Sequence, residues 1–124
     1  LISLSKSVTI LETLSKTYVY QFNWESPVVD GKLGAIHALD VAFVLDNLKI
    51  SEPLVGNISS AQPLAIGVSQ AIVSFVKTGT PTSTSLPAWP EYNETTRQTM
   101  VFDKVSKIVT DLDRDIRKIW ETRK

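Results

Sequence analysis

The sequence of 124 residues contains no cysteine, which excludes a disulfide framework, a thiolate nucleophile and a cysteine-ligated metal site. Its 13 basic and 13 acidic side chains cancel, so no surface that attracts nucleic acid or anionic lipid is indicated. No uninterrupted apolar run approaches the roughly 20 residues that span a bilayer. We therefore expect no nucleic-acid partner and no membrane partner. The missing cysteine fits a cytoplasmic location, with secretion not excluded.

What remains is the composition of an ordinary globular protein, with 43% apolar and 21% charged residues. The chain starts at Leu1-Ile2-Ser3, without a methionine and without the pattern of a signal peptide, so we expect a piece of a longer protein. Two glycosylation sequons begin at Asn57 and Asn93 and would matter only in a secreted protein.

Histidine is nearly as scarce as cysteine, because His37 is the single one in the chain. It follows a strand-like segment, residues 17–24, and a loop, residues 25–33, and therefore lies just beyond the carboxyl end of a predicted strand. Sites in open α/β sheets are built at that edge. Histidine is also the side chain that both accepts and donates a proton near neutral pH. By itself, however, a lone histidine among apolar neighbours is more often structural than catalytic.

Apolar residues at steps of three and four predict three helices. Their apolar stripes are Leu1, Leu4, Val8, Leu11 and Leu14 in residues 1–14; Leu64, Val68, Ala71, Ile72 and Phe75; and Leu112, Ile116, Ile119 and Trp120 in residues 111–124. We expect Pro63 in the first turn of the second helix and Gly79 at its end.

Two strands, a short helix and two loops complete the predicted secondary structure. Residues 18–22 are dense in aromatic and β-branched side chains and predict an inner strand covered on both faces, and residues 99–103 predict a short strand. A short helix should pack beneath His37 and end near Asp46. Residues 49–60 are predicted to be loop, and residues 86–90 an aromatic and proline-rich loop across the second helix.

Several segments of the chain carry a recognisable pattern: Gly34-Ala35-Ile36-His37-Ala38-Leu39-Asp40, Phe43-Val44, Tyr18-Val19-Tyr20-Gln21-Phe22, Phe75-Val76-Lys77-Thr78-Gly79-Thr80-Pro81, Trp89-Pro90-Glu91-Tyr92, Arg97 and Thr99-Met100-Val101-Phe102-Asp103. The segment around His37 resembles the catalytic-histidine segment of type B carboxylesterases, particularly the bacterial para-nitrobenzyl-esterase-like group. The resemblance extends in order over nearly the whole chain. It implies an α/β class and the carboxyl-terminal part of an α/β-hydrolase fold, a mixed sheet flanked by helices that is incomplete in this chain.

The same resemblance implies that His37 is the histidine of a Ser-acid-His triad that hydrolyses carboxylic esters without a cofactor. In this fold the serine and the acid come before the histidine. Residues 1–124 would then form the carboxyl-terminal fragment of one domain, with serine and acid upstream of Leu1. No Gly-x-Ser-x-Gly motif occurs in the chain, as that order predicts. The fragment alone should be inactive.

Other polar and aromatic residues favour structural roles. We interpret Asp40 as a carboxylate at a helix start rather than as the triad acid. Asp111, Asp113 and Asp115 are interleaved with basic residues and lack the glycine and glutamate of an EF-hand, which favours a solvated helix start. The three tryptophans, Trp24, Trp89 and Trp120, are predicted packing anchors. Ser26 and the serines of residues 83–85 have no nucleophile elbow around them, which argues against a nucleophilic role.

Three positions depart from the family pattern: Ala42 is often proline, Leu45 often phenylalanine and Ile72 often tryptophan. The expected partners are a small-molecule ester and either the amino-terminal part of the same protein or a second copy of the chain. A non-catalytic, cholinesterase-like binding domain is the alternative function, and a self-sufficient helical scaffold with a core histidine is a third. The missing cysteine counts against the binding domain.

Overall fold

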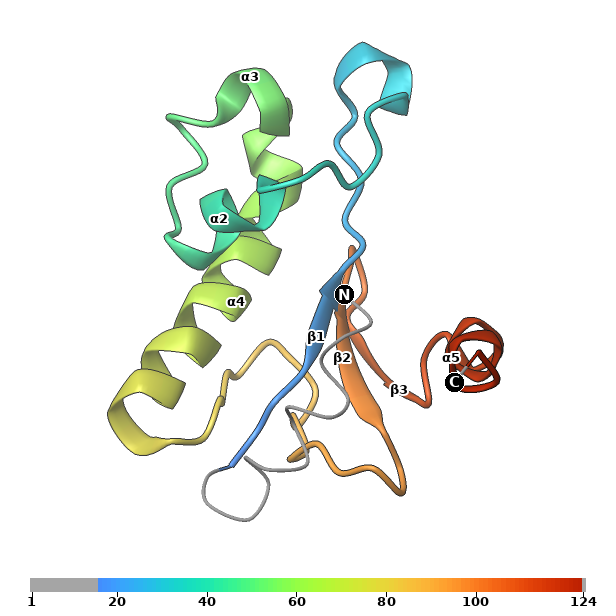
Figure 1. The fold of residues 1–124 in the computed structure, drawn as a ribbon. Helices are drawn as coiled ribbons and strands as arrows, with labels where there is room; N and C mark the ends of the chain where they lie inside the picture. Colours follow the sequence, from blue (N-terminus) through green and yellow to red (C-terminus); the bar gives the residue numbers. More distant parts are fainter. Residues whose placement is uncertain (1–15, 124) are drawn as a thin grey trace.

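A computed structural model of the protein describes residues 16–123, and the helix predicted for residues 1–14 lies outside them. The elements, in chain order, are β1 (Tyr20–Phe22), η1 (Val28–Gly31), α2 (Leu39–Val44), α3 (Glu52–Val55), α4 (Ile58–Thr78), β2 (Gln98–Phe102), β3 (Lys107–Thr110) and α5 (Arg114–Glu121). Figure 1 shows three strands side by side, with α4 along one side and α5 at the other.

The sheet is mixed, as predicted. β1 runs parallel to β2 with Tyr20 opposite Met100, and β2 runs antiparallel to β3 with Thr99 opposite Val109. β2 is the central strand, and Thr99 to Phe102 are buried. Its position between two neighbours satisfies the backbone groups on both of its sides.

The strand predicted for residues 18–22 is present as β1, over three residues. It pairs with β2 alone among the described strands and leaves Tyr20 37% exposed. Its other edge has no strand partner within residues 16–123, so the inner position stays a prediction for the longer protein. Such an edge is able to pair with a further strand.

Helix α4 begins at Ile58, earlier than the sequence predicted. Asn57 caps its amino terminus, because the side-chain oxygen of Asn57 accepts a hydrogen bond from the amide of Ser60 at 3.1 Å. Pro63 consequently lies inside the helix rather than in its first turn. The predicted end is confirmed, since Gly79 adopts a left-handed φ of 75° just after the last helical residue.

Residues 49–60 are not loop throughout. They contain α3, a single turn, and the start of α4. The turn forms because it buries Val55, which is fully inaccessible in the core. A single buried apolar residue cannot give a helical period, and α3 was therefore not predicted from the sequence.

One core joins α2, α4 and the sheet. Its largest buried side chains include Trp24, Phe43, Phe102, Met100 and Val68. Leu64, Val68 and Ala71 confirm the buried stripe predicted for α4, whereas Phe75 is 40% exposed. By length and composition α4 is the one described helix that could cross a membrane, yet its stripe belongs to this core, as in the core helix of a globular fold.

The loop of residues 86–90 packs as predicted. Trp89 is 8% exposed and makes edge contacts with Tyr18, Tyr20 and Phe102 at centroid distances of 6.1, 6.1 and 5.4 Å. Leu86 crosses α4 at Gly67, where an added Cβ would lie 3.1 Å from Leu86 Cγ. The glycine thus permits the close approach of loop and helix.

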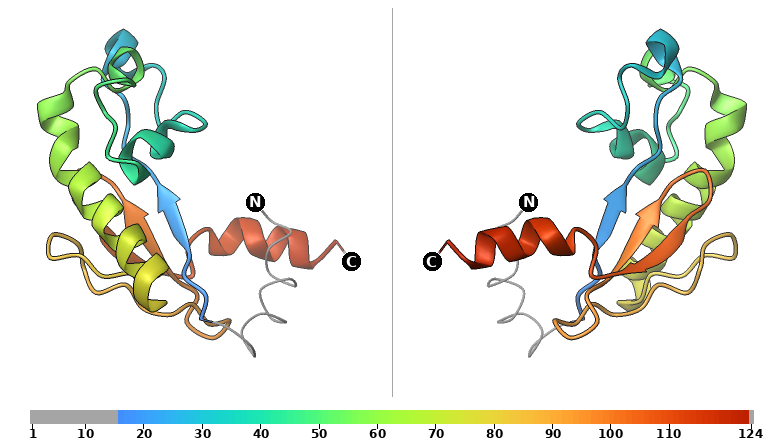
Figure 2. Two further views of the ribbon diagram at one scale, coloured as in Figure 1. Left: turned by 90° about the vertical axis from the view of Figure 1, so that its left-hand side faces the viewer. Right: turned by 90° about the vertical axis from the view of Figure 1, so that its right-hand side faces the viewer.

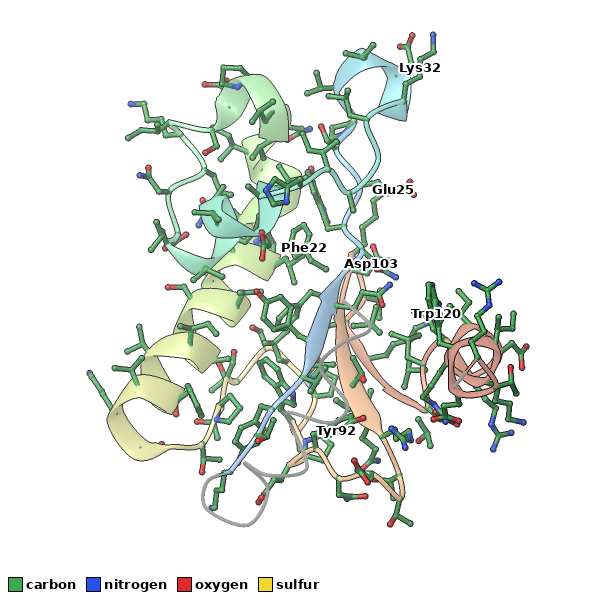
Figure 3. The ribbon with its side chains drawn as sticks, viewed as in Figure 1. Phe22, Glu25, Lys32, Tyr92, Asp103 and Trp120 are labelled. Atoms are coloured by element: carbon green, nitrogen blue, oxygen red, sulfur yellow. The ribbon has the colours of Figure 1, made fainter. Side chains whose placement is uncertain are left out.

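Helix α5 has the predicted apolar stripe but no cover for it among the described residues. Ile116, Ile119 and Trp120 are 51%, 55% and 48% exposed, and α5 extends away from the side that α4 occupies (Figure 2). Trp120 is therefore not a packing anchor in this structure, in contrast to Trp24 and Trp89, and Figure 3 shows it clear of the sheet. β3, which precedes α5, was not predicted.

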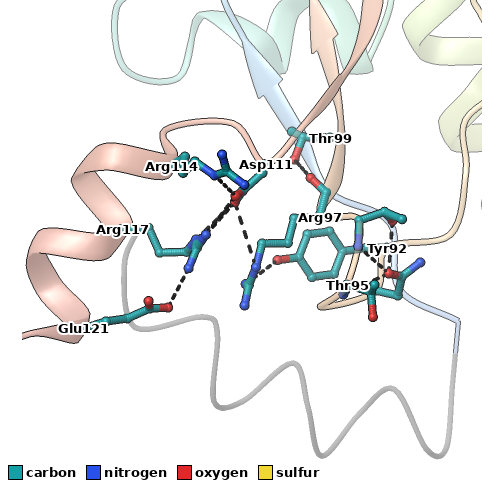
Figure 4. A network of polar contacts seen from close by, with 10 residues as sticks. Tyr92, Thr95, Arg97, Thr99, Asp111, Arg114, Arg117 and Glu121 are labelled. Carbon is teal, nitrogen blue, oxygen red and sulfur yellow. Dashed lines mark hydrogen bonds and ion pairs between the residues drawn. The ribbon is translucent and has the colours of Figure 1, made fainter.

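Ion pairs, rather than apolar contacts, connect α5 to the end of β3 (Figure 4). Arg117 donates to both carboxylate oxygens of Asp111 at 2.8 to 3.1 Å, and Arg114 donates at 3.0 Å. Arg97 lies 3.9 Å from the same carboxylate. The helix start is therefore ion-paired around Asp111, whereas the sequence predicted that it is only solvated.

We expect these ion pairs to fail in acid. The hydrogen bonds from Arg117, and then those from Arg114, lower the pKa of Asp111. Because the pKa of Asp111 is lowered in the folded state, its ion pairs contribute fully to stability above the ordinary carboxyl pKa of about 3.9. This contribution to stability is lost as the pH falls through the lowered pKa. The hydrogen-exchange protection of α5, measured relative to the intrinsic exchange rate at each pH, should therefore fall below about pH 4. Asp111→Asn should exchange fast already at pH 7, and an unchanged rate in that variant would contradict the account.

Candidate functional site

His37 lies in the turn between the loop that follows β1 and the first turn of α2. The side chain is exposed and forms no hydrogen bond within residues 16–123. This position confirms that the histidine lies past the carboxyl end of β1. It also makes the structural interpretation of a hydrogen-bonded core histidine wrong.

The loop that leads to His37 is fixed at both ends. The amide of Ser26 donates to the carbonyl of Gly34 at 3.2 Å, which closes residues 26–34 into a pinned loop. Ser26 is fully buried, and its hydroxyl donates to the carbonyl of Leu54. Val28 packs against Gly56, where an added Cβ would lie only 2.9 Å from Val28 Cγ2. His37 thus follows a braced backbone rather than a free loop.

The turn beneath His37 is held by apolar side chains. Leu39 and Phe43 are 2% and 0% exposed, and the Phe43 ring lies 4.9 Å from Phe22 and 5.0 Å from Trp24. Ala38 adopts a left-handed φ of 65°, which is strained for a residue with a Cβ. The buried side chains anchor one face of this turn, and the imidazole of His37 is left on the solvent side.

Asp40 has a role that the sequence did not indicate. The hydroxyl of Tyr20 donates to Asp40 Oδ2 at 2.9 Å and so connects β1 to the first turn of α2. Partial burial, followed by the hydrogen bond and the negative charge of Asp40, raises the pKa of Tyr20 to about 12. Tyr20 therefore remains a protonated donor throughout the neutral range.

An open hollow of about 600 Å³ lies at the carboxyl ends of β1 and β2. Asn23, Glu25, Ala35, Asp103 and Lys104 line it, and Figure 3 shows Glu25 and Asp103 at this end of the sheet. His37 is not among the lining residues, although Ala35 is two residues away from it. The hollow is polar and wide open.

A complete triad is not assembled within residues 16–123, because His37 contacts neither a serine nor a carboxylate there. The hydroxyl of Ser26 is directed to Leu54, and the hydroxyls of Ser83 and Ser85 lie 3.2 Å from each other. Asp40 is engaged by Tyr20. That these serines and Asp40 are neither the nucleophile nor the acid stays a prediction.

Solved structures define the class. The chain superposes with a TM-score of 0.79 and 25% identity on an esterase from anaerobic Clostridium hathewayi that hydrolyses aliphatic aromatic polyesters, over 91% of this chain and 22% of that one. It superposes with a TM-score of 0.76 and 29% identity on a PNB esterase, over 86% and 22%. The fold is part of the α/β-hydrolase fold of these esterases.

Sequence comparison defines the family. The model of the carboxylesterase family matches residues 2–120, and the chain therefore belongs to that family. It is 33% identical over 100 residues to phenmedipham hydrolase of Pseudarthrobacter oxydans, covering 77% of this chain. It is 32% identical over 103 residues to para-nitrobenzyl esterase of Bacillus subtilis (strain 168), covering 82%. The chain spans 20% and 21% of these two relatives.

Proposed function

We propose that this chain is the carboxyl-terminal portion of a serine carboxylesterase and that His37 is its general base. The observation that carries the proposal is the placement of His37, which is exposed on a braced turn past the end of β1 in a chain of the carboxylesterase family. A general base has to be accessible to a substrate that binds at the protein surface, and His37 is exposed. The braced turn also holds the imidazole of His37 in one position.

In the proposed reaction, His37 accepts the proton of a serine hydroxyl while that serine attacks the ester carbonyl. It then protonates the departing alcohol, and it repeats the two transfers with water to release the carboxylic acid. No cofactor takes part in this sequence. A carboxylate outside this chain would hold the imidazole in the correct tautomer.

The serine, the acid and the oxyanion hole would come from the amino-terminal part of the same protein. Two features of the structure support this. The outer edge of β1 has no partner among the described strands, and the chain spans about one fifth of the relatives it matches. A second copy of the chain is the other candidate to cover the free edge.

The proposed substrates are small carboxylic esters, since one of the similar proteins is named para-nitrobenzyl esterase. The three departures from the family pattern lie in and near α2 and in α4. Ala42 is buried, Leu45 is 67% exposed and Ile72 packs partly against the core. Ala42 and Ile72 therefore contribute to the packing of α2 and α4.

A comparison of the isolated chain with the full-length protein tests the proposal. We expect no hydrolysis of a chromogenic short-chain ester by residues 1–124 alone, because the nucleophile is missing, and clear hydrolysis by the full-length protein. Native mass spectrometry of both samples shows whether an amino-terminal part or a second copy accompanies the chain. A folded full-length protein without esterase activity would contradict the proposal and favour the non-catalytic binding domain.

A further inference from the structure

We propose that Tyr20 and Asp40 form a clamp that positions His37 for proton transfer. The inference rests on the proposed role of His37 and extends it to two residues of the same chain. The two side chains lie 20 positions apart in sequence, yet the Tyr20 hydroxyl lies 2.9 Å from Asp40 Oδ2. The hydrogen bond connects the sheet to the turn that carries His37.

The sheet side of the clamp is rigid. The Tyr20 ring lies 5.3 Å from the Phe102 ring and 6.1 Å from the Trp89 ring, and Phe102 and Trp89 are both buried. Tyr20 itself belongs to β1, whose parallel pairing with β2 fixes the backbone. The ring contacts thus hold the hydroxyl in a fixed position, and the hydrogen bond costs little further ordering.

The turn side of the clamp needs a restraint. α2 has only six residues, its cap residue Ala38 is strained at a φ of 65°, and no side chain caps the helix. Asp40 lies in the first turn, three residues after His37. Within the described part of the chain, its bond to Tyr20 is the one side-chain hydrogen bond between α2 and the sheet. Removal of this bond leaves α2 attached to the sheet by apolar side-chain contacts, which fix its orientation less strictly than a hydrogen bond does.

Asp40 could instead act on His37 through its negative charge, and a substitution separates the two roles. Asp40→Asn removes the charge but keeps an oxygen that accepts from Tyr20, so a clamp survives it. Asp40→Ala removes both. A role through charge would shift the acid limb of the pH profile of kcat/KM in Asp40→Asn, because a nearby carboxylate raises the pKa of an imidazolium.

The experiment measures kcat, KM and the pH profile of the full-length enzyme for Tyr20→Phe, Asp40→Ala, Asp40→Asn and the double variant Tyr20→Phe/Asp40→Ala. We expect the first two to lower kcat roughly 10- to 100-fold with KM changed less than about twofold, since misplacing a catalytic group affects the rate more than binding. Asp40→Asn should retain activity within about threefold of wild type. The double variant should lose no more than either single variant.

Tyr18→Phe is the matched control, because Tyr18 makes ring contacts with Phe75 and Trp89 but its hydroxyl has no hydrogen bond within residues 16–123. It should leave kcat unchanged. Wild-type kcat in Tyr20→Phe, or an Asp40→Asn variant as impaired as Asp40→Ala, would overturn the clamp. His37→Ala tests the proposed function separately from the clamp. An active His37→Ala enzyme refutes the proposed function. An inactive His37→Ala enzyme supports the proposed function, and the Tyr20→Phe result then decides only the clamp.

Discussion

Replacing His37 by alanine in the full-length protein should lower kcat/KM for a short-chain ester by on the order of 10³- to 10⁶-fold. Without the imidazole no group of this chain takes the serine proton or supplies a proton to the departing alcohol.

The matched control for this variant is Lys32→Ala, an exposed residue of the same pinned loop. It should keep wild-type activity. The assignment would be refuted by a His37→Ala enzyme that keeps more than a tenth of the wild-type rate.

The second large effect is on the stability of the fold and concerns Phe43, whose side chain anchors α2, and with it the turn that contains His37, to the core. Its ring is fully buried between Phe22 and Trp24 at 4.9 and 5.0 Å. Phe43→Ala leaves a cavity at this point, and we expect it to lower the free energy of unfolding by about 3 to 5 kcal/mol. Denaturant unfolding followed by tryptophan fluorescence measures the loss.

Val41→Ala is the matched control on the same helix, because Val41 is 50% exposed. It should change the free energy of unfolding by less than about 0.5 kcal/mol. A loss below about 1 kcal/mol for Phe43→Ala would mean that α2 is not anchored through this ring, and the account of how His37 is held would then fail.

The sequence predicted those parts of the fold that have a long or dense apolar signal. α4 has a stripe of five apolar residues over its length, and β2 is a compact β-branched and aromatic run, so both were found within a few residues of their true limits. The amino terminus of α4 was missed because Asn57 begins the helix with a polar side chain, ahead of the apolar stripe.

Short elements and edges could not be predicted in the same way. β3 has four residues and α3 has four, too few for a period to be recognised. The inner position predicted for residues 18–22 cannot be judged from β1 alone, because apolarity reports burial but not the number of strand partners. Trp120 shows the same limit, since its stripe predicts an apolar contact and does not say which part of a protein supplies it.

The candidate site shows a similar division. His37 was found from its scarcity and from the motif around it, and its exposure agrees with the proposed role. The Tyr20–Asp40 hydrogen bond could not be found, because it joins residues 20 positions apart through a geometry that only the fold creates. The pairing of Asp111 with Arg117 was hidden in the alternating charges that were interpreted as solvated.

The central claim is that the histidine of this chain works with a serine outside it, and covalent trapping tests it most directly. The full-length protein and residues 1–124 alone are each treated with a fluorophosphonate, which modifies an activated serine, and are analysed by intact mass and peptide mapping. The account predicts one adduct on the full-length protein, on a serine that precedes Leu1, much slower labelling of His37→Ala, and no adduct on the isolated chain. An adduct on a serine within residues 1–124, or labelling that is as fast without His37, would contradict it.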